Sequence, residues 1–159
     1  MAKRSKTNAM RILDNQQIAY KMYSYENNDG KIDGISVAKK IGKDVKVVYK
    51  TLVAQGLSKE IYVFIIPVLY ELNVKLAAKA AGEKSLHLVP VKEIQKWTGY
   101  IRGGCSPIGM KKQYKTFLDE RAKQLDTIIV SGGKIGTQIE LAVKDLLAVT
   151  KGRLESLTQ

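Results

Sequence analysis

The sequence has very little of the residue types that carry most enzyme chemistry. Its 159 residues include a single cysteine and a single histidine. One cysteine cannot form a disulfide within the chain, which favours a reducing compartment. Zinc sites need several His and Cys ligands at fixed spacing, so we expect neither a metal ion nor another cofactor. A Ser-His or Cys-His catalytic site would have to use His87, whose strand-like segment SLHLV favours a structural or surface role.

Long hydrophobic runs are also missing. The longest nearly apolar run, IYVFIIPVLY at 61–70, is half of the roughly 20 residues that a membrane-spanning helix needs. The basic start, MAKRSKTNAMRILD, leads into no apolar segment, so we expect no signal peptide. These two absences predict a cytoplasmic protein without a membrane partner.

Acidic residues are few compared with basic ones. The chain has 15 Asp and Glu against 27 Lys and Arg, which gives a formal net charge of +12 and a pI of about 9.7. Such a surplus favours a polyanionic partner, although solvated lysines in a lysine-rich proteome would also explain it. The basic residues form three groups: Lys3, Arg4 and Lys6; Lys39, Lys40, Lys43, Lys46 and Lys50; Lys111, Lys112 and Lys115.

The remaining pattern is a mixture of short helices and strands. With 45% hydrophobic residues, the chain can bury one core, so we expect a single domain over residues 1–159. Hydrophobic periodicity, capping residues and glycines predict helices at 7–16, 35–42, 73–82, 91–99 and 143–152, and strands at 18–26, 47–54, 61–67, 85–89 and twice within 126–141. This order lacks a strict βαβ rhythm, so we expect an α/β (α+β) fold whose mixed, barrel-like sheet is flanked by short α-helices.

Two glycine-rich segments suggest different chemistry. SGGKIGT at 131–137 is no P-loop, because Ile128 and Ile135 stand where that motif needs glycine and Ser or Thr. GYIRGGCSPIG at 99–109 contains Gly103 and Gly104, where backbone amides can approach a ligand closely. Cys105 has no neighbouring histidine to lower its pKa, so we interpret it as a small residue in a tight turn rather than a nucleophile.

Lys50 is the most informative charged residue. In a strand it shares a face with Val48, Leu52 and Ala54. If that face is buried, the lysine needs a carboxylate partner or an anion or carbonyl supplied by a ligand. Alternatively, the strand lies at the edge of a sheet and Lys50 reaches solvent. The spacing alone does not choose between these interpretations.

Four segments occur in the order and spacing of one known family: KTNAMRIL at 6–13, VYKTLV at 48–53, TGYIRGGCSPIGMKK at 98–112 and IIVSGGKIG at 128–136. The chain resembles the YbaK/EbsC family of Cys-tRNA(Pro) deacylases, which are related to the editing domain of bacterial prolyl-tRNA synthetases. The resemblance implies the YbaK fold and a trans-editing enzyme that removes cysteine from mischarged tRNA(Pro). It also implies a ternary complex with prolyl-tRNA synthetase and tRNA.

The resemblance assigns roles to individual residues. Lys50 matches the essential lysine, and Gly103 and Pro107 match a Gly-x-x-x-Pro motif. From the lack of side chains at Gly103 and Gly104 we expect their backbone N–H groups to donate to the ester carbonyl oxygen. The implied substrate-binding residues are Tyr25, Thr51, Ser106, Pro107, Ser131, Gly132 and Gly133. Several relatives carry an aliphatic residue at the place of Cys105, and some carry aspartate at the place of Gln138. The family resemblance implies that the thiol of the substrate itself attacks the ester, so that no protein nucleophile is needed.

Two alternatives stay open. The chain could be a deacylase for alanine or another small amino acid on tRNA(Pro), or a non-catalytic module that binds tRNA and regulates translation. A basic surface would serve all of these functions. Lys50 and the loop from Gly103 to Pro107 favour an enzyme, because a simple RNA-binding module needs neither.

Overall fold

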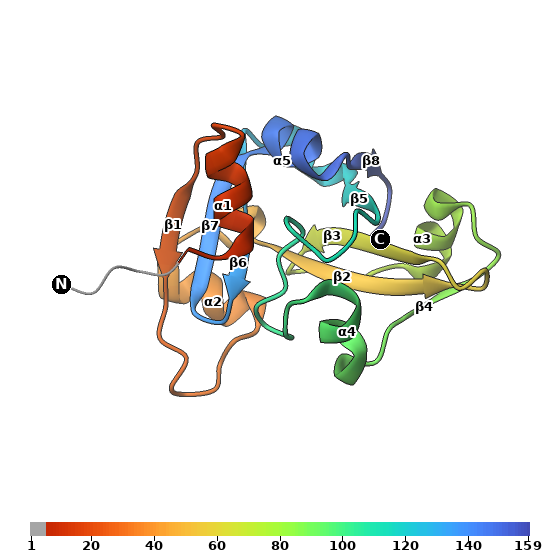
Figure 1. Cartoon of the computed structure of the whole chain (residues 1–159), viewed down its shortest axis with the longest axis horizontal. Helices are drawn as coiled ribbons and strands as arrows, with labels where there is room; N and C mark the ends of the chain where they lie inside the picture. The colour runs from red at the N-terminus through yellow and green to blue at the C-terminus, as the bar shows by residue number, and fades with distance from the viewer. Residues whose placement is uncertain (1–5) are drawn as a thin grey trace.

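The computed structural model describes residues 6–159 and divides the strands between two sheets (Figure 1). Lys3 and Arg4 of the first basic group lie outside the described residues. The smaller sheet has the order β1-β7-β6, with β1 at Lys21–Ser24, β6 at Thr127–Lys134 and β7 at Thr137–Ala142, and both pairings are antiparallel. It lies on the left of Figure 1, beside helix α1.

The larger sheet has the order β4-β2-β3-β5-β8. Its strands are β2 (Tyr49–Gly56), β3 (Ile61–Pro67), β4 (Leu86–Leu88), β5 (Lys115–Asp119) and β8 (Arg153–Glu155). β2 pairs antiparallel with β3 and β4, whereas β5 pairs in parallel with β3 and β8. The expected mixed α/β fold is thus confirmed.

A bridge between Val48 and Ile129 joins the start of β2 to β6. Within the described residues the strands nevertheless form two separate sheets and do not close into a barrel. The junction between the sheets creates a corner, and the loop between α4 and β5 runs through this region in Figure 1. The corner is where the candidate site lies.

Local capping explains most of the helices. They are α1 (Asn8–Asn15), α2 (Gly34–Ile41), α3 (Val74–Ala81), α4 (Ile94–Thr98) and α5 (Val143–Thr150), with 3-10 turns at Val45–Val47, Val91–Glu93 and Glu120–Gln124. The side chains of Thr7, Asp33 and Asn73 accept backbone N–H groups at the starts of α1, α2 and α3. Gly42 and Gly82 adopt the left-handed conformation that ends α2 and α3.

Two strands of the larger sheet were not predicted from the sequence. β5 and β8 are short, and each joins the sheet through parallel pairing with a strand distant in the chain. Such pairing depends on tertiary packing rather than on a local turn. In addition, the segment expected to form one helix at 91–99 is a 3-10 turn followed by the short α4.

The core holds both sheets in place. Leu13 of α1, Ile139 of β7 and Leu146 of α5 are fully buried in one cluster. In a second cluster, the rings of Phe64 and Phe117 stack with centroids 5.5 Å apart. Burial of each large side chain contributes about 1.5–3 kcal/mol to folding. The site corner is therefore built on a rigid framework.

No helix between residues 6 and 159 is long and apolar enough to cross a membrane.

Candidate active site

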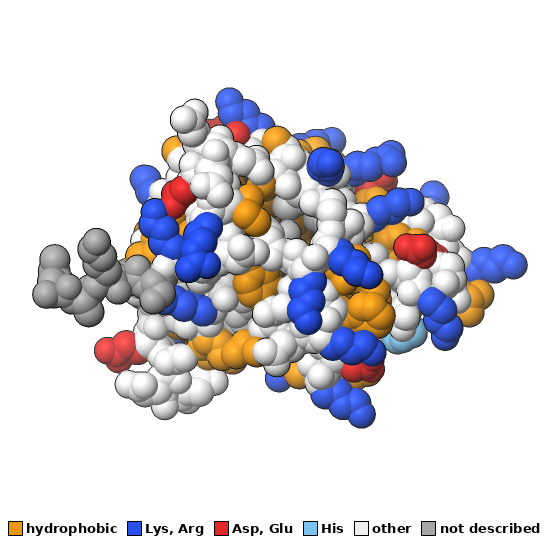
Figure 2. Space-filling view, in the orientation of Figure 1, with side chains coloured by type: hydrophobic (Ala, Val, Ile, Leu, Met, Phe, Trp, Pro, Cys, Tyr) orange, Lys and Arg blue, Asp and Glu red, His pale blue; other side chains and the backbone are white. Residues whose placement is uncertain are grey.

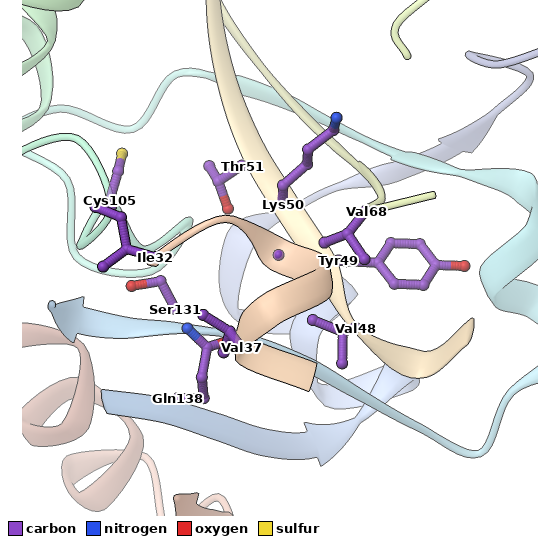
Figure 3. A pocket seen from close by; sticks show the side chains of 12 residues that line it. Ile32, Val37, Val48, Tyr49, Lys50, Thr51, Val68, Cys105, Ser131 and Gln138 are labelled. Carbon is purple, nitrogen blue, oxygen red and sulfur yellow. The ribbon is translucent and has the colours of Figure 1, made fainter. Parts of the chain in front are cut away.

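A cavity of about 120 Å³ opens at the corner where the start of β2 faces β6, β7 and the loop after α4 (Figure 3). Its polar lining consists of Lys50, Thr51, Ser131, Gln138 and the backbone of Gly103. Its apolar wall includes Ile32, Val37, Val48 and Val68. The volume suits a small side chain.

Lys50 lies at the rim of this cavity. Val48 and Ala54 are buried, at 1% and 0% exposure, but Leu52 between them is only half-buried. Tyr49 and Val53 on the opposite face are buried as well, so burial along β2 does not alternate as expected. β2 lies between β3 and β4 in the larger sheet, but β4 pairs only with residues 54–56, so at Lys50 the strand is paired with β3 alone. The Lys50 side chain is 29% exposed, and Figure 3 shows its ammonium pointing away from Ser131 and Gln138. The side chain is therefore placed to contact a group that enters from solvent.

The carboxylate nearest to Lys50 belongs to Glu71, with Nζ and Oε1 3.7 Å apart. The Glu71 side chain is 94% exposed. Exposed ion pairs of this kind contribute about 0–1 kcal/mol, because solvent screens them and long side chains lose entropy. Glu71 is therefore a weakly held partner that an incoming anion can replace.

Thr51 presents a buried hydroxyl to the same region. Its Oγ1 has no hydrogen-bond partner among residues 6–159. A buried, unsatisfied hydroxyl costs about 1–3 kcal/mol, so such groups occur where a ligand supplies the missing partner. Thr51 follows Lys50 directly on β2, and both line the cavity.

Ser131 and Gln138 face each other across the two strands β6 and β7. Ser131 Oγ accepts the N–H of Gly133 at 3.3 Å, within a register irregularity of β6. Gln138 is 6% exposed and lines the cavity. The amide thus offers the cavity both a donor and an acceptor.

The loop after α4 approaches β6 and β7 very closely. A Cβ on Gly104 would lie 2.8 Å from the backbone of Lys134 and Ile135, so the position requires glycine. The Gly104 N–H donates to the Ile101 carbonyl at 2.9 Å, which leaves it unavailable to a substrate in this structure. The Gly103 N–H has no backbone partner in the described part of the chain, and Gly103 lines the cavity. The geometry therefore favours Gly103 over Gly104 as a donor.

Cys105 also lines the cavity and is buried, at 9% exposure. Burial raises the pKa of its thiol to about 11, although a hydrogen bond with Thr98 partly opposes the shift. At neutral pH the thiol is therefore protonated and a poor nucleophile. In Figure 3 its sulfur points away from Ser131 and Gln138.

The other residues singled out by the resemblance do not line the cavity. Ser106 Oγ accepts the N–H of Ile108, and the Gly132 carbonyl accepts the hydroxyl of Thr7 at 2.5 Å. Both contacts shape loops around the site. Pro107 lines a different cavity, beside α1. Gly133 donates its N–H to Ser131 and so supports that side chain indirectly.

Tyr25 also lies outside the cavity lining. Its backbone N–H donates to the Gly136 carbonyl at 2.9 Å, and its ring lies 5.8 Å from the ammonium of Lys40. Its hydroxyl is buried without a hydrogen-bond partner among the described residues. Tyr25 is therefore placed behind the β6–β7 turn, with one polar atom unsatisfied.

The apolar wall was missed by sequence reasoning. Ile32 precedes α2, Val37 lies within it, and Val68 follows β3. Nothing in a hydrophobic pattern separates a residue that lines a cavity from one that fills a core. Gln138 could have been identified from the sequence, because it is a polar residue in one predicted strand that pairs with Ser131 of the other.

Comparison with known proteins agrees with this geometry. The model of the aminoacyl-tRNA editing domain family matches residues 34–149. EbsC of Enterococcus faecalis, which carries the provisional name Cys-tRNA(Pro)/Cys-tRNA(Cys) deacylase, is 44% identical over 153 residues, covering 96% of this chain and 93% of that protein.

Two solved structures share the fold. One, described provisionally as a trans-editing enzyme for prolyl tRNA synthetase, has a TM-score of 0.84 at 22% identity and covers 98% of this chain and 99% of that one. The other, the hypothetical protein APE2540, has a TM-score of 0.87 at 17% identity and covers 96% of this chain and 99% of that one. At these identities the likeness establishes the fold alone.

Proposed function

The chain belongs to the aminoacyl-tRNA editing domain family, and we propose that it is a trans-editing deacylase that removes cysteine from mischarged Cys-tRNA(Pro). The family resemblance expected from the four sequence segments is confirmed. The observation that carries the proposal is the small cavity, which combines Lys50 at its rim with Thr51, Gly103 and Ser131 inside.

The need for a second site follows from the limits of discrimination. One methylene of difference between amino acids is worth only about 1–3 kcal/mol in a binding pocket. A synthetase that accepts proline therefore also accepts amino acids of similar size. A separate cavity of about 120 Å³ admits a cysteinyl group and can clear the wrong ester.

The chemistry proposed here uses the thiol of the substrate. The sulfur attacks the ester carbonyl of the same cysteinyl group, so a C–S bond forms and the C–O bond to the terminal ribose breaks. The thiol proton passes to the ribose oxygen, and the released thiolactone is later hydrolysed by water. A reaction within one bound molecule gains chiefly from orientation, which the cavity wall supplies.

The one protein thiol that lines the cavity, Cys105, is a poor competing nucleophile. The raised pKa of the Cys105 thiol, about 11, keeps it protonated. His87 lies on β4 opposite Gln55, at the other end of β2 from Lys50, and does not line the cavity. A mechanism that needs only positioning and charge stabilisation fits these facts.

Two groups have roles in this mechanism. The ammonium of Lys50 contacts either the phosphate of the terminal adenosine or the charge that develops on the carbonyl oxygen. The N–H of Gly103 is the donor placed to stabilise that oxygen as it becomes negative. The Gly104 N–H takes no part, because Ile101 already accepts it.

The proposed function includes a substrate, a cellular compartment and a partner protein. The substrate is an aminoacyl-tRNA, which the net charge of +12 attracts. We also propose that the domain spans residues 1–159, acts in the cytoplasm and joins prolyl-tRNA synthetase and tRNA in a ternary complex.

A panel of charged tRNAs tests the function. Wild-type protein and Lys50→Ala are incubated with Cys-tRNA(Pro), Cys-tRNA(Cys), Ala-tRNA(Pro) and Pro-tRNA(Pro), and the remaining ester is measured over time. The proposal predicts rapid loss of Cys-tRNA(Pro) with wild type only, and an intact prolyl ester. If Ala-tRNA(Pro) were deacylated faster than Cys-tRNA(Pro), the preferred substrate would be the alanyl ester. Binding of tRNA without any deacylation would make the protein a regulatory module.

A further inference from the structure

A second groove, of about 290 Å³, adjoins the candidate active site. Tyr49 belongs to the lining of both cavities. Figure 3 shows its ring pointing away from Ser131 and Gln138, on the other side of β2 from these residues. The groove and the proposed ester site thus lie on two sides of β2 and share Tyr49 in their linings.

A stacked cation and aromatic ring form one wall of this groove. The guanidinium carbon of Arg121 lies 4.1 Å from the centroid of the Tyr70 ring. Both residues line the groove, together with Lys46, Leu69 and Gln124. Leu69 is 47% exposed and adds an apolar side chain to the wall beside this pair.

Arg121 is fixed in position by a buried anchor. Its Nε donates to Thr158 Oγ1 at 3.1 Å and lies 3.9 Å from a carboxylate oxygen of Asp119. Asp119 is 1% exposed and accepts the Thr158 hydroxyl at 2.7 Å. The guanidinium plane is therefore already ordered in the free protein, so stacking of a ligand on it costs little further side-chain entropy.

These features fit an unpaired nucleobase better than an apolar peptide. Aromatic rings and arginine planes bind bases of single-stranded RNA by stacking, whatever the base. Lys46 supplies a positive charge for a phosphate, and Gln124 supplies an amide for a base edge. No Asp or Glu is among the described residues that line the groove, and the one carboxylate near Arg121 is the buried Asp119 behind the wall. Figure 2 shows that Lys and Arg outnumber Asp and Glu across the visible face.

We propose that this groove binds the unpaired nucleotides that precede the terminal adenosine of tRNA, with one base stacked against Tyr70 and Arg121 and its phosphate near Lys46. The inference rests on the proposed function, because the esterified adenosine must then lie at Lys50. In this proposal the RNA passes around the start of β2, because the linings of the two cavities meet at Tyr49.

Binding of uncharged RNA tests the groove without requiring catalysis. A fluorescent single-stranded RNA with the 3′ end sequence of tRNA is titrated by fluorescence anisotropy into wild type, Tyr70→Ala and Tyr70→Phe. Tyr70→Ala should weaken binding about five- to hundredfold, and Tyr70→Phe should restore most of it. Lys84→Gln, which removes an exposed charge beyond the far end of β2, should bind like wild type.

A kinetic ratio supplies the second readout. The rate on Cys-tRNA(Pro) is divided by the rate on the cysteinyl ester of adenosine, which lacks the preceding nucleotides. Tyr70→Ala should lower this ratio about tenfold through a higher KM for Cys-tRNA(Pro). Lys46→Gln should also lower the ratio. The second variant keeps the test valid if the first one unfolds.

The outcomes separate the two proposals. RNA binding that depends on Tyr70 in a protein that cleaves no Cys-tRNA would uphold the groove and reject the deacylase. Cleavage of Cys-tRNA(Pro) with an unchanged ratio and unchanged RNA binding in Tyr70→Ala would reject the groove and leave the deacylase standing.

Discussion

The ammonium of Lys50 lies 3.7 Å from the carboxylate of Glu71, at the rim of a cavity that is otherwise lined by neutral groups. Lys50 is partly enclosed by β2 and its neighbours, whereas Glu71 projects into solvent. The contact therefore holds the lysine in place without neutralising it strongly. When a substrate oxygen or phosphate arrives, Glu71 can turn away at little cost.

This relationship predicts opposite results for two neighbouring substitutions. Lys50→Ala should slow deacylation of Cys-tRNA(Pro) about ten- to hundredfold or more, because a charge-assisted contact is worth about 1.5–3 kcal/mol. Glu71→Gln should keep most of the activity, since it removes only an exposed partner. Single-turnover rates measure both, with circular dichroism to confirm folding. Full activity in a folded Lys50→Ala protein would show that the site is elsewhere.

The thiol of Cys105 supplies a second prediction. Its pKa is raised to about 11, so thiolate is scarce until the pH rises far above neutrality. Iodoacetamide should therefore modify the folded protein very slowly at pH 7.5 and rapidly after unfolding, which mass spectrometry can follow because the chain has one cysteine.

The matching substitution, Cys105→Ala, should leave deacylation within a few-fold of wild type. Removing the small buried thiol should lower the free energy of unfolding somewhat but should leave the catalytic step unchanged. If a folded Cys105→Ala protein lost all activity, the protein thiol would have to be reconsidered as the nucleophile.

Gly104 gives a prediction about the loop. An alanine there would place Cβ 2.8 Å from the backbone of Lys134 and Ile135. We expect Gly104→Ala to lower the free energy of unfolding by about 1–3 kcal/mol and, because the loop moves away from the cavity, to reduce deacylation about tenfold.

The control for this variant is Gly82→Ala. Gly82 has a φ of +73° and no atom within 4 Å of an added Cβ, so the change carries a backbone cost of about 1–2 kcal/mol alone. Urea unfolding should show losses for both variants, while the activity should fall for Gly104→Ala only. Equal activity in the two variants would show that the loop position does not matter for the reaction.

The sequence predicted those parts of the fold that local interactions determine. Thr7 and Asn73 begin helices and Gly42 and Gly82 end them, because capping involves residues within one turn. β5 and β8 could not be predicted in this way, since their strand partners lie far away in the chain. The curling of the strands into a barrel was also expected, and the structure shows two sheets joined at Val48 instead.

The same distinction holds for the candidate site. Lys50 stood out because apolar residues share its strand face, and it does line the cavity, although β2 is buried on both faces rather than on that face alone. The bond from Gly104 to Ile101 depends on how the loop turns, so composition could not reveal that one of the two amides is occupied. Ile32 and Val68 resemble any core residue in the sequence, although they form part of the wall.

The most direct test of the mechanism is a comparison of Cys-tRNA(Pro) with Ser-tRNA(Pro), two esters that differ by one atom. If the substrate thiol is the nucleophile, wild-type protein should cleave the seryl ester at least about a hundredfold more slowly, because a hydroxyl is a far weaker nucleophile than a thiol at neutral pH. Mass spectrometry of the quenched cysteinyl reaction should also detect the thiolactone before water opens it. Equal rates for the two esters, with free amino acid as the first product of each, would contradict the account and assign the attack to a bound water molecule.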